Sequence, residues 1–184
     1  MSELHADASR LLGGWVATSD EADLARRQTL ELLSAGTTTV SRAHRSGHVT
    51  ASALVVDDAG RLLLCLHGRL NLWMQLGGHC EAADPTLAAA ALREATEESG
   101  IAGLTIDPNP IDVDVHEVRC TPADNEPASS SIHYDVRFLL RCPPNATAQI
   151  SHESKALEWF TPTTLPTPLA PATTRQIPPA LSRL

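Results

Sequence analysis

Three glutamates near the middle of the chain have the spacing of a metal-binding helix face. The segment Arg93–Ile101 reads REATEESGI and places Glu94, Glu97 and Glu98 at positions i, i+3 and i+4. On an α-helix these positions share one face, with neighbouring Cβ atoms roughly 5–6 Å apart. Like charges at that spacing weaken a helix, but carboxylate oxygens are the ligands that Mg²⁺ and Mn²⁺ prefer. The spacing therefore indicates a divalent-cation site.

The residues that flank these glutamates predict the ends of their helix. Asp84 is the expected N-cap, Pro85 the expected first helical residue, and Gly100 the expected left-handed stop. Upstream, Gly77-Gly78 allows a tight loop whose carbonyls could face the same cation. Arg93 stands four residues before Glu97 and can hold that carboxylate in place.

Together these residues resemble the Nudix box, Gly-x5-Glu-x7-Arg-Glu-U-x-Glu-Glu-x-Gly-U, in which U is a bulky aliphatic residue. The match covers Gly78, Arg93-Glu94, Glu97-Glu98 and Gly100-Ile101. Two positions depart from the pattern. Asp84 replaces the first glutamate and stands one residue further from Arg93, and Ala95 replaces a bulky aliphatic residue. The extra residue falls at the junction of loop and helix, so it affects the loop geometry more than the glutamates.

The resemblance implies an α/β fold, an α/β/α sandwich with a mixed sheet. It also implies hydrolysis of a diphosphate linkage in a nucleoside diphosphate derivative or a related small molecule. Mg²⁺ or Mn²⁺ would support the attack of water on phosphorus. Carried over to this chain, Glu94 and Glu98 would be the principal ligands, together with the Gly78 carbonyl. Glu97 would be a ligand or the base that orients the water, held by Arg93.

Hydrophobic patterning predicts the elements that position these residues. Strands His48–Val56 and Arg61–Leu66 flank a turn at 57–60. Further strands are expected at Leu72–Leu76, Ile111–Val118 and Ile132–Arg141, and helices at Asp20–Ser34 and Ala172–Arg183. We expect a catalytic domain over 47–184, preceded by an N-terminal helical extension over 1–46 that is a candidate for forming a homodimer.

Charge and hydropathy argue against a nucleic-acid partner and against membrane association. The net charge is −8 and no basic stripe is present, which argues against a nucleic-acid partner. No apolar run is long enough to cross a bilayer, and residues 1–14 do not read as a signal peptide, so no membrane association is expected. The four cysteines lack CxxC spacing, which favours free thiols in a reducing cytoplasm.

Histidines suggest a second metal site. Period-two alternation places Asp112, Asp114 and His116 on one strand face, and His133, Asp135 and Arg137 on one face of the next strand. In isopentenyl-diphosphate isomerases, which are Nudix relatives, one metal-binding histidine follows the box glycine and another opens the first strand. His79 and His48 stand at those places. One hypothesis is therefore a site for Zn²⁺ or Mn²⁺ built from His48, His79 and His133, with His116 as a further candidate. The alternative is that these rings bond to the backbone or bind substrate phosphate.

Other positions are candidates for contact with substrate. Trp73 could stack on a base, Arg69 could bind phosphate or ribose, and Arg137 lies on a polar strand face. Glu153 stands six residues before Trp159, where many family members place a further glutamate, so it is a candidate ligand or base.

Two other functions stay open. An isomerase would need the cysteine that its relatives place just before the box glycine, and this chain has Gly77 there. A non-catalytic nucleotide-binding module usually lacks one or more box glutamates, whereas this chain retains Glu94, Glu97 and Glu98. Retention of all three favours hydrolysis.

Overall fold

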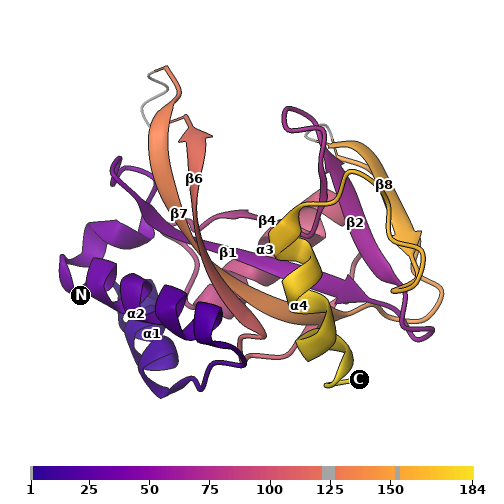
Figure 1. Cartoon of the computed structure of the whole chain (residues 1–184), viewed down its shortest axis with the longest axis horizontal. Coiled ribbons are helices and arrows are strands. Elements are labelled where there is room, and N and C mark those ends of the chain that lie inside the picture. The colour runs from indigo at the N-terminus through magenta and orange to yellow at the C-terminus, as the bar shows by residue number, and fades with distance from the viewer. Residues whose placement is uncertain (1, 122–126, 152–153) are drawn as a thin grey trace.

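A mixed sheet with helices on both faces forms the fold (Figure 1). The computed structural model describes residues 2–121, 127–151 and 154–184, so Glu153 lies outside the described residues. Within these ranges the helices are α1 (Glu3–Gly14), α2 (Asp20–Ser34), α3 (Leu87–Ser99) and α4 (Pro171–Leu181), with a 3₁₀ helix η1 at Thr37–Val40. The strands are β1 (His48–Val56), β2 (Leu62–His67), β3 (Trp73–Met74), β4 (Leu76–His79), β5 (Thr105–Ile106), β6 (Asp112–Cys120), β7 (Ser129–Arg141) and β8 (Ser154–Phe160).

The centre of the sheet is a parallel pair, β1 and β7, aligned from His48 opposite His133 to Val56 opposite Arg141. The other pairings between the strands named above are antiparallel: β2 and β4 with β1, β5 and β6 with β7, and β3 and β8 with β2. The predicted hairpin is confirmed. Its turn is held by Asp57, whose carboxylate accepts hydrogen bonds from the amides of Ala59 and Arg61.

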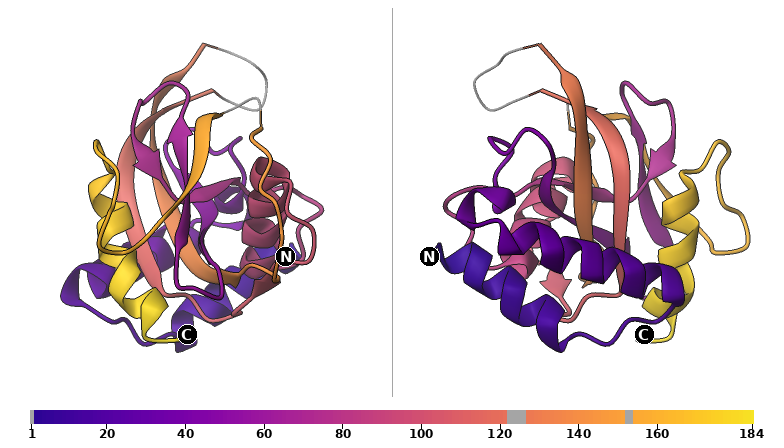
Figure 2. Two further views of the ribbon diagram at one scale, coloured as in Figure 1. Left: turned by 90° about the vertical axis from the view of Figure 1, so that its right-hand side faces the viewer. Right: turned by 60° about the vertical axis from the view of Figure 1, so that its left-hand side comes forward.

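The two faces of the sheet have different cover. Alternate residues of β1 (Val49, Ala51, Ala53 and Val55) join α1, α2 and α3 in one apolar core. On the opposite face, Leu54 and Val56 pack with Ile177 and Ala180 of α4. Figure 2 shows α1 and α2 running side by side across one end of the molecule. The predicted sandwich with an N-terminal helical extension is therefore confirmed.

The extension is attached to the rest of the molecule rather than separate from it. Helix α1, which was not predicted, contributes the buried Leu4, Ala8 and Leu12 to the main core. The Trp15 indole N–H donates to the Pro110 carbonyl at 2.8 Å. Of the helices in the described ranges, none combines the length and apolar character needed to cross a bilayer.

Arg137 lies at the centre of a buried ion cluster on the α4 face. Its guanidinium donates to Asp112, Asp114 and Asp135 at 2.8–3.0 Å, and also to the Ala172 carbonyl at the start of α4. The side chain is only 2% exposed. In this structure the donors of Arg137 are engaged by these carboxylates and by Ala172, so a contact between Arg137 and substrate stays a prediction.

Candidate active site and histidine cluster

Helix α3 carries the three glutamates and begins two residues later than predicted. Thr86 is the N-cap, and its hydroxyl accepts a hydrogen bond from the amide of Ala89 at 3.0 Å. The predicted caps Asp84 and Pro85 instead lie in the preceding turn, where Asp84 accepts from the amide of Glu81 at 2.7 Å. The predicted stop is confirmed, since Gly100 is left-handed with φ +65°.

Arg93 ties the helix to the loop in front of it. Its Nε and Nη2 atoms donate to the two oxygens of Asp84 at 3.0 and 2.9 Å, and Nη2 also donates to the His79 carbonyl. Its Nη1 atom donates to Glu94 and to Glu97. Burial alone would raise the pKa of Asp84, but hydrogen bonds from Arg93 and from the Glu81 amide hold it below its ordinary value. Asp84 is therefore a charged support for Arg93 rather than a helix cap.

Two of the glutamates lie directly against the glycine loop. The amide of Gly77 donates to Glu98 Oε2 at 2.9 Å. A Cβ atom on Gly78 would stand only 2.7–2.9 Å from the carboxylate atoms of Glu94. Glu97 points outward, with 61% of its side chain exposed and Arg93 as its ion-pair partner. Glu94 and Glu98 therefore lie at the glycine loop, whereas Glu97 lies at the solvent-exposed rim of the site.

This donor set fits Mg²⁺ or Mn²⁺. Every candidate ligand is a hard oxygen, which is the preference of both ions. The absence of a side chain at Gly78 leaves the loop backbone within reach of Glu94, as a shared ion would need. Glu94, Glu98 and the Gly78 carbonyl are accordingly the residues that would hold the cation.

Behind the loop, three histidines and a cysteine form a compact group. One ligand atom from each of His48, His79, His133 and Cys120 can be chosen so that all four lie within 4.8 Å of one another. The ring centroids of the three histidines are 4.9–5.2 Å apart. Burial, with a contribution from neighbouring histidines, lowers the pKa of His79 to about 4 and that of His133 to about 3. Both rings are therefore neutral at pH 7.

A comparison with protein families identifies the domain that contains the three glutamates. The family model described as NUDIX domain matches residues 47–181. The chain belongs to the Nudix family. Comparison with curated proteins found no match.

Solved structures confirm the fold of this Nudix domain. A NUDIX-family hydrolase from Clostridium perfringens is 22% identical with a TM-score of 0.55, over 75% of this chain and 98% of that one. The E. coli dihydroneopterin triphosphate pyrophosphohydrolase is 18% identical with a TM-score of 0.54, over 74% and 96%. The E. coli ORF135 protein is 26% identical with a TM-score of 0.50, over 74% and 89%.

The remaining predicted site residues are spread around the Nudix box. His116 is exposed and bonds to Asp114 at 2.9 Å, so it lies beside the histidine group rather than in it. Arg69 is exposed in the turn between β2 and β3. Trp73 packs edge-on against Phe160 with 4.9 Å between ring centroids, which makes it a packing residue of the α4 face.

Cys120 is the functional candidate that sequence reasoning missed. It is buried, and its Sγ lies 3.2 Å from His79 Nε2. The alternation that grouped Asp112, Asp114 and His116 extends to Cys120, which is four residues beyond His116. The predicted strand ended at Val118, whereas β6 continues to Cys120, so a prediction with the correct end would have included this cysteine. All four cysteines are free thiols in this structure.

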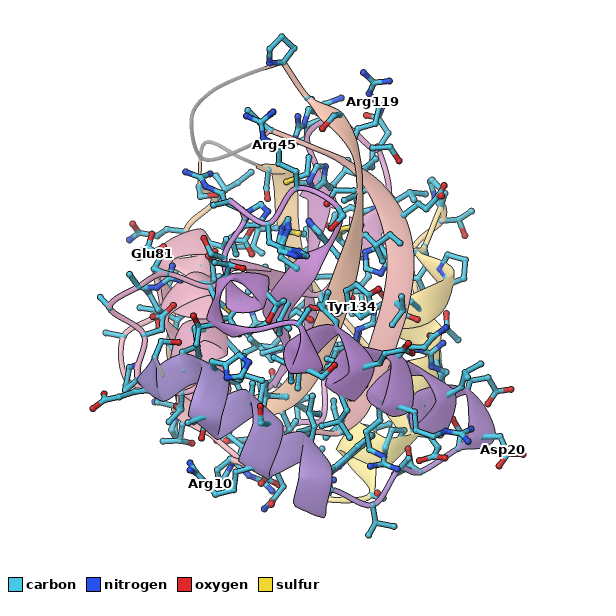
Figure 3. All side chains as sticks on the ribbon, turned by 90° about the vertical axis from the view of Figure 1, so that its left-hand side faces the viewer. Arg10, Asp20, Arg45, Glu81, Arg119 and Tyr134 are labelled. Atoms are coloured by element: carbon cyan, nitrogen blue, oxygen red, sulfur yellow. The ribbon has the colours of Figure 1, made fainter. Side chains whose placement is uncertain are left out.

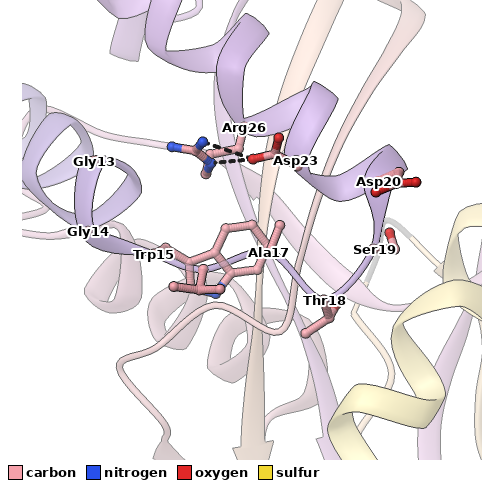
Figure 4. Close-up of a pocket in the computed structure, with 10 residues that line it drawn as sticks. Gly13, Gly14, Trp15, Ala17, Thr18, Ser19, Asp20, Asp23 and Arg26 are labelled. Carbon is pink, nitrogen blue, oxygen red and sulfur yellow. Dashed lines mark hydrogen bonds and ion pairs between the residues drawn. The ribbon is translucent and has the colours of Figure 1, made fainter.

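A separate hollow lies in the N-terminal extension (Figure 4). Its lining comes entirely from the α1–α2 connection and its flanks, residues 13–20 together with Asp23 and Arg26. Arg26 and Asp23 are ion-paired at its edge. Because the hollow includes no residue of the Nudix box, we do not assign it to the active site.

Proposed function

We propose that this Nudix protein is a divalent-metal-dependent hydrolase that cleaves the diphosphate linkage of a nucleoside diphosphate derivative or a related small molecule. The observation that carries the proposal is the contact of Glu94 and Glu98 with the Gly77-Gly78 loop, held in place by Arg93. Hard oxygen donors are thus gathered at one point beside an exposed carboxylate, Glu97.

Each residue has a distinct role in this proposal. Glu94, Glu98 and the Gly78 carbonyl would hold Mg²⁺ or Mn²⁺, which would supply charge to offset the phosphates and to lower the pKa of a bound water. Glu97, which is exposed beside these ligands, would be a further ligand or the base that orients the water. Arg93 keeps Glu97 and Glu94 oriented and fixes the loop through Asp84.

Two finer assignments belong to the same proposal. Exposed Arg69 is a candidate for binding substrate phosphate, since an acidic protein needs local cations for an anionic substrate. Four free thiols favour a reducing compartment such as the cytoplasm.

The test is product release from nucleoside triphosphates, nucleotide sugars, dinucleotides and prenyl diphosphates, each with Mg²⁺, Mn²⁺ or a chelator. We expect one class to release phosphate or a nucleoside monophosphate, only when metal is present. Isomerisation of a prenyl diphosphate without hydrolysis would instead support the isomerase alternative. No product from any compound, with one of them still raising the melting temperature, would indicate a nucleotide-binding module.

A further inference from the structure

Four strands bring soft and borderline metal ligands to one end of the sheet. His48 opens β1, His79 ends β4, Cys120 ends β6, and His133 lies near the start of β7. Strand β4 is antiparallel to β1, and β6 is antiparallel to β7, while β1 and β7 are parallel. These strand ends therefore meet at the same end of the sheet. The register places His133 opposite both His48 and His116. The cluster is thus a consequence of topology and involves no residue of the glutamate trio.

Two buried ring nitrogens in the cluster make no hydrogen bond within the described part of the chain. The Nε2 atoms of His48 and His133 are buried and have no hydrogen-bond partner among the described residues. His48 is only 1% exposed, so water does not satisfy it from outside. Leaving a buried polar atom without a hydrogen-bond partner is unfavourable, so two such atoms within one four-residue cluster need a reason. A metal ion within the cluster would provide one.

The second ring nitrogen of His48 is already oriented. Its Nδ1 lies 3.3 Å from the His44 carbonyl, to which it can donate a proton. A neutral imidazole that donates through Nδ1 presents the lone pair of Nε2 toward its other neighbours. This arrangement, with one nitrogen bonded to a carbonyl and the other free, is typical of metal-binding histidines.

The distances suit a tetrahedral ion. With Zn–N near 2.0 Å and Zn–S near 2.3 Å, ligand atoms around one zinc are separated by roughly 3.3–3.8 Å. His79 Nε2 and Cys120 Sγ are 3.2 Å apart, and the whole group lies within 4.8 Å. The upper limit of 4.8 Å is about 1 Å longer than the separation expected around zinc, so the ligand atoms would move closer together when the ion binds.

We propose that His48, His79, His133 and Cys120 form a four-ligand Zn²⁺ site, separate from the Nudix box. Three imidazoles and one thiolate favour Zn²⁺ over Mg²⁺ or Mn²⁺, which prefer oxygen ligands. Four protein ligands leave no open position, as in structural rather than catalytic zinc sites. The predicted fourth histidine, His116, is replaced by Cys120, because His116 bonds to Asp114 at the surface.

Such an ion would join β6 and β7 to β1 and β4 at an end of the sheet where positive charge gathers. Arg42, Arg45, Ser129 and Ser131 line the surface next to His48 and Cys120. Figure 3 shows Arg45 and Arg119 together at this end of the molecule, away from Arg10 and Asp20. These cations do not bind the metal themselves, and the thiolate ligand would form when the ion binds and the Cys120 proton is released. Since His79 directly follows Gly78, the ion would also fix the loop that carries the Nudix glutamates.

The test uses the full chain, stripped with a chelator and titrated with Zn²⁺ and with Co²⁺, whose thiolate complexes absorb light. We expect one ion per chain, a thiolate-to-cobalt band, and a higher melting temperature with zinc. Cys120→Ser should lose the band and the thermal shift, and His133→Ala should lose tight binding. Cys142→Ser, a buried cysteine outside the cluster, and His116→Ala should behave like the wild-type protein.

Glu98→Gln separates this inference from the proposed hydrolase, since it should abolish turnover while zinc content stays unchanged. Failure of the wild-type chain to retain zinc or cobalt at micromolar concentration would overturn the site. So would a thiolate band that persists in Cys120→Ser, a result that remains readable if His133→Ala fails to fold.

Discussion

Gly77 and Gly78 are adjacent, yet they serve different purposes. Gly77 has φ +149°, and a Cβ there would lie 2.3 Å from Ser52 Cβ and 2.4 Å from Ser52 Cα. For a Cβ on Gly78, the three nearest atoms all belong to the carboxylate end of Glu94. The first glycine therefore allows β4 to pack on β1, and the second leaves room for the carboxylate of Glu94.

Alanine at each glycine should separate stability from activity. Gly77→Ala forces backbone atoms apart and takes an unfavourable φ, so we expect a loss of about 3 kcal/mol in the free energy of unfolding. Gly78→Ala should fold with nearly normal stability, because a flexible side chain can give way. Its displaced Glu94 should lower kcat/KM by about 100-fold. Urea unfolding and steady-state kinetics of both variants make the comparison, and equal stability losses would contradict it.

At the scale of elements, α3 is positioned by contacts that come from distant parts of the chain. The Asp7 carboxylate in α1 accepts a hydrogen bond from the amide of Leu87 at 2.9 Å. That amide is in the first turn of α3, where backbone donors lack partners within the helix. The N-terminal extension thus stabilises the helix that carries the Nudix glutamates.

Removing this contact should weaken α3 without touching the active site. We expect Asp7→Ala to lower the free energy of unfolding by about 1 kcal/mol, the usual value of a capping side chain. Asp58→Ala, at an exposed turn position, should change it little. Thermal unfolding of the two variants provides the measurement. Equal stability of Asp7→Ala and the wild-type protein would show that the contact contributes nothing.

Elements with strong local patterns could be predicted from the sequence, and those that depend on distant partners could not. Short-range periodicity predicts the helix Asp20–Ser34, the hairpin that β1 forms with β2, and a helix that carries the three glutamates, and all three elements were confirmed. Pro85 misled the prediction of the helix start, since Asp84 is engaged by Arg93 instead of by helix amides. Strand β5 has two residues and takes its identity only from pairing with β7.

At the scale of the whole molecule, the α4 face of the sheet is held together by a buried ion cluster as well as by apolar side chains. Asp135 accepts hydrogen bonds from Thr50, Ser52 and Arg137, linking β1 to β7. Burial alone would raise the pKa of Asp135, but the charge of Arg137 lowers it below the ordinary value. Arg175 of α4 adds bonds to Asp112 and Asp114. The sequence predicted polar faces on β6 and β7, but it did not predict that their charged side chains form ion pairs with one another.

Loss of the central arginine should destabilise the whole fold. Arg137→Met leaves the buried carboxylate of Asp135 without the cation that pairs with it, although Arg175 still bonds to Asp112 and Asp114. Removing one partner of a buried ion pair costs about 3–5 kcal/mol. Arg27→Met, which removes an exposed ion pair on α2, should have a small effect. Chemical denaturation of both proteins checks the prediction. A normal midpoint for Arg137→Met would mean that the cluster is not a stabilising centre.

The most direct test of the proposed hydrolase is the Mg²⁺-dependent turnover of Glu98→Gln, on the compound class that the wild-type protein cleaves. This change keeps the shape of the side chain at the Gly77 amide and removes one charge from the cation site. We predict that kcat/KM falls by about 1,000-fold, an effect of about 4 kcal/mol, while the melting temperature is retained or raised. Glu31→Gln, on the exposed face of α2, should keep full activity. Full turnover by Glu98→Gln would contradict the role assigned to the Nudix glutamates.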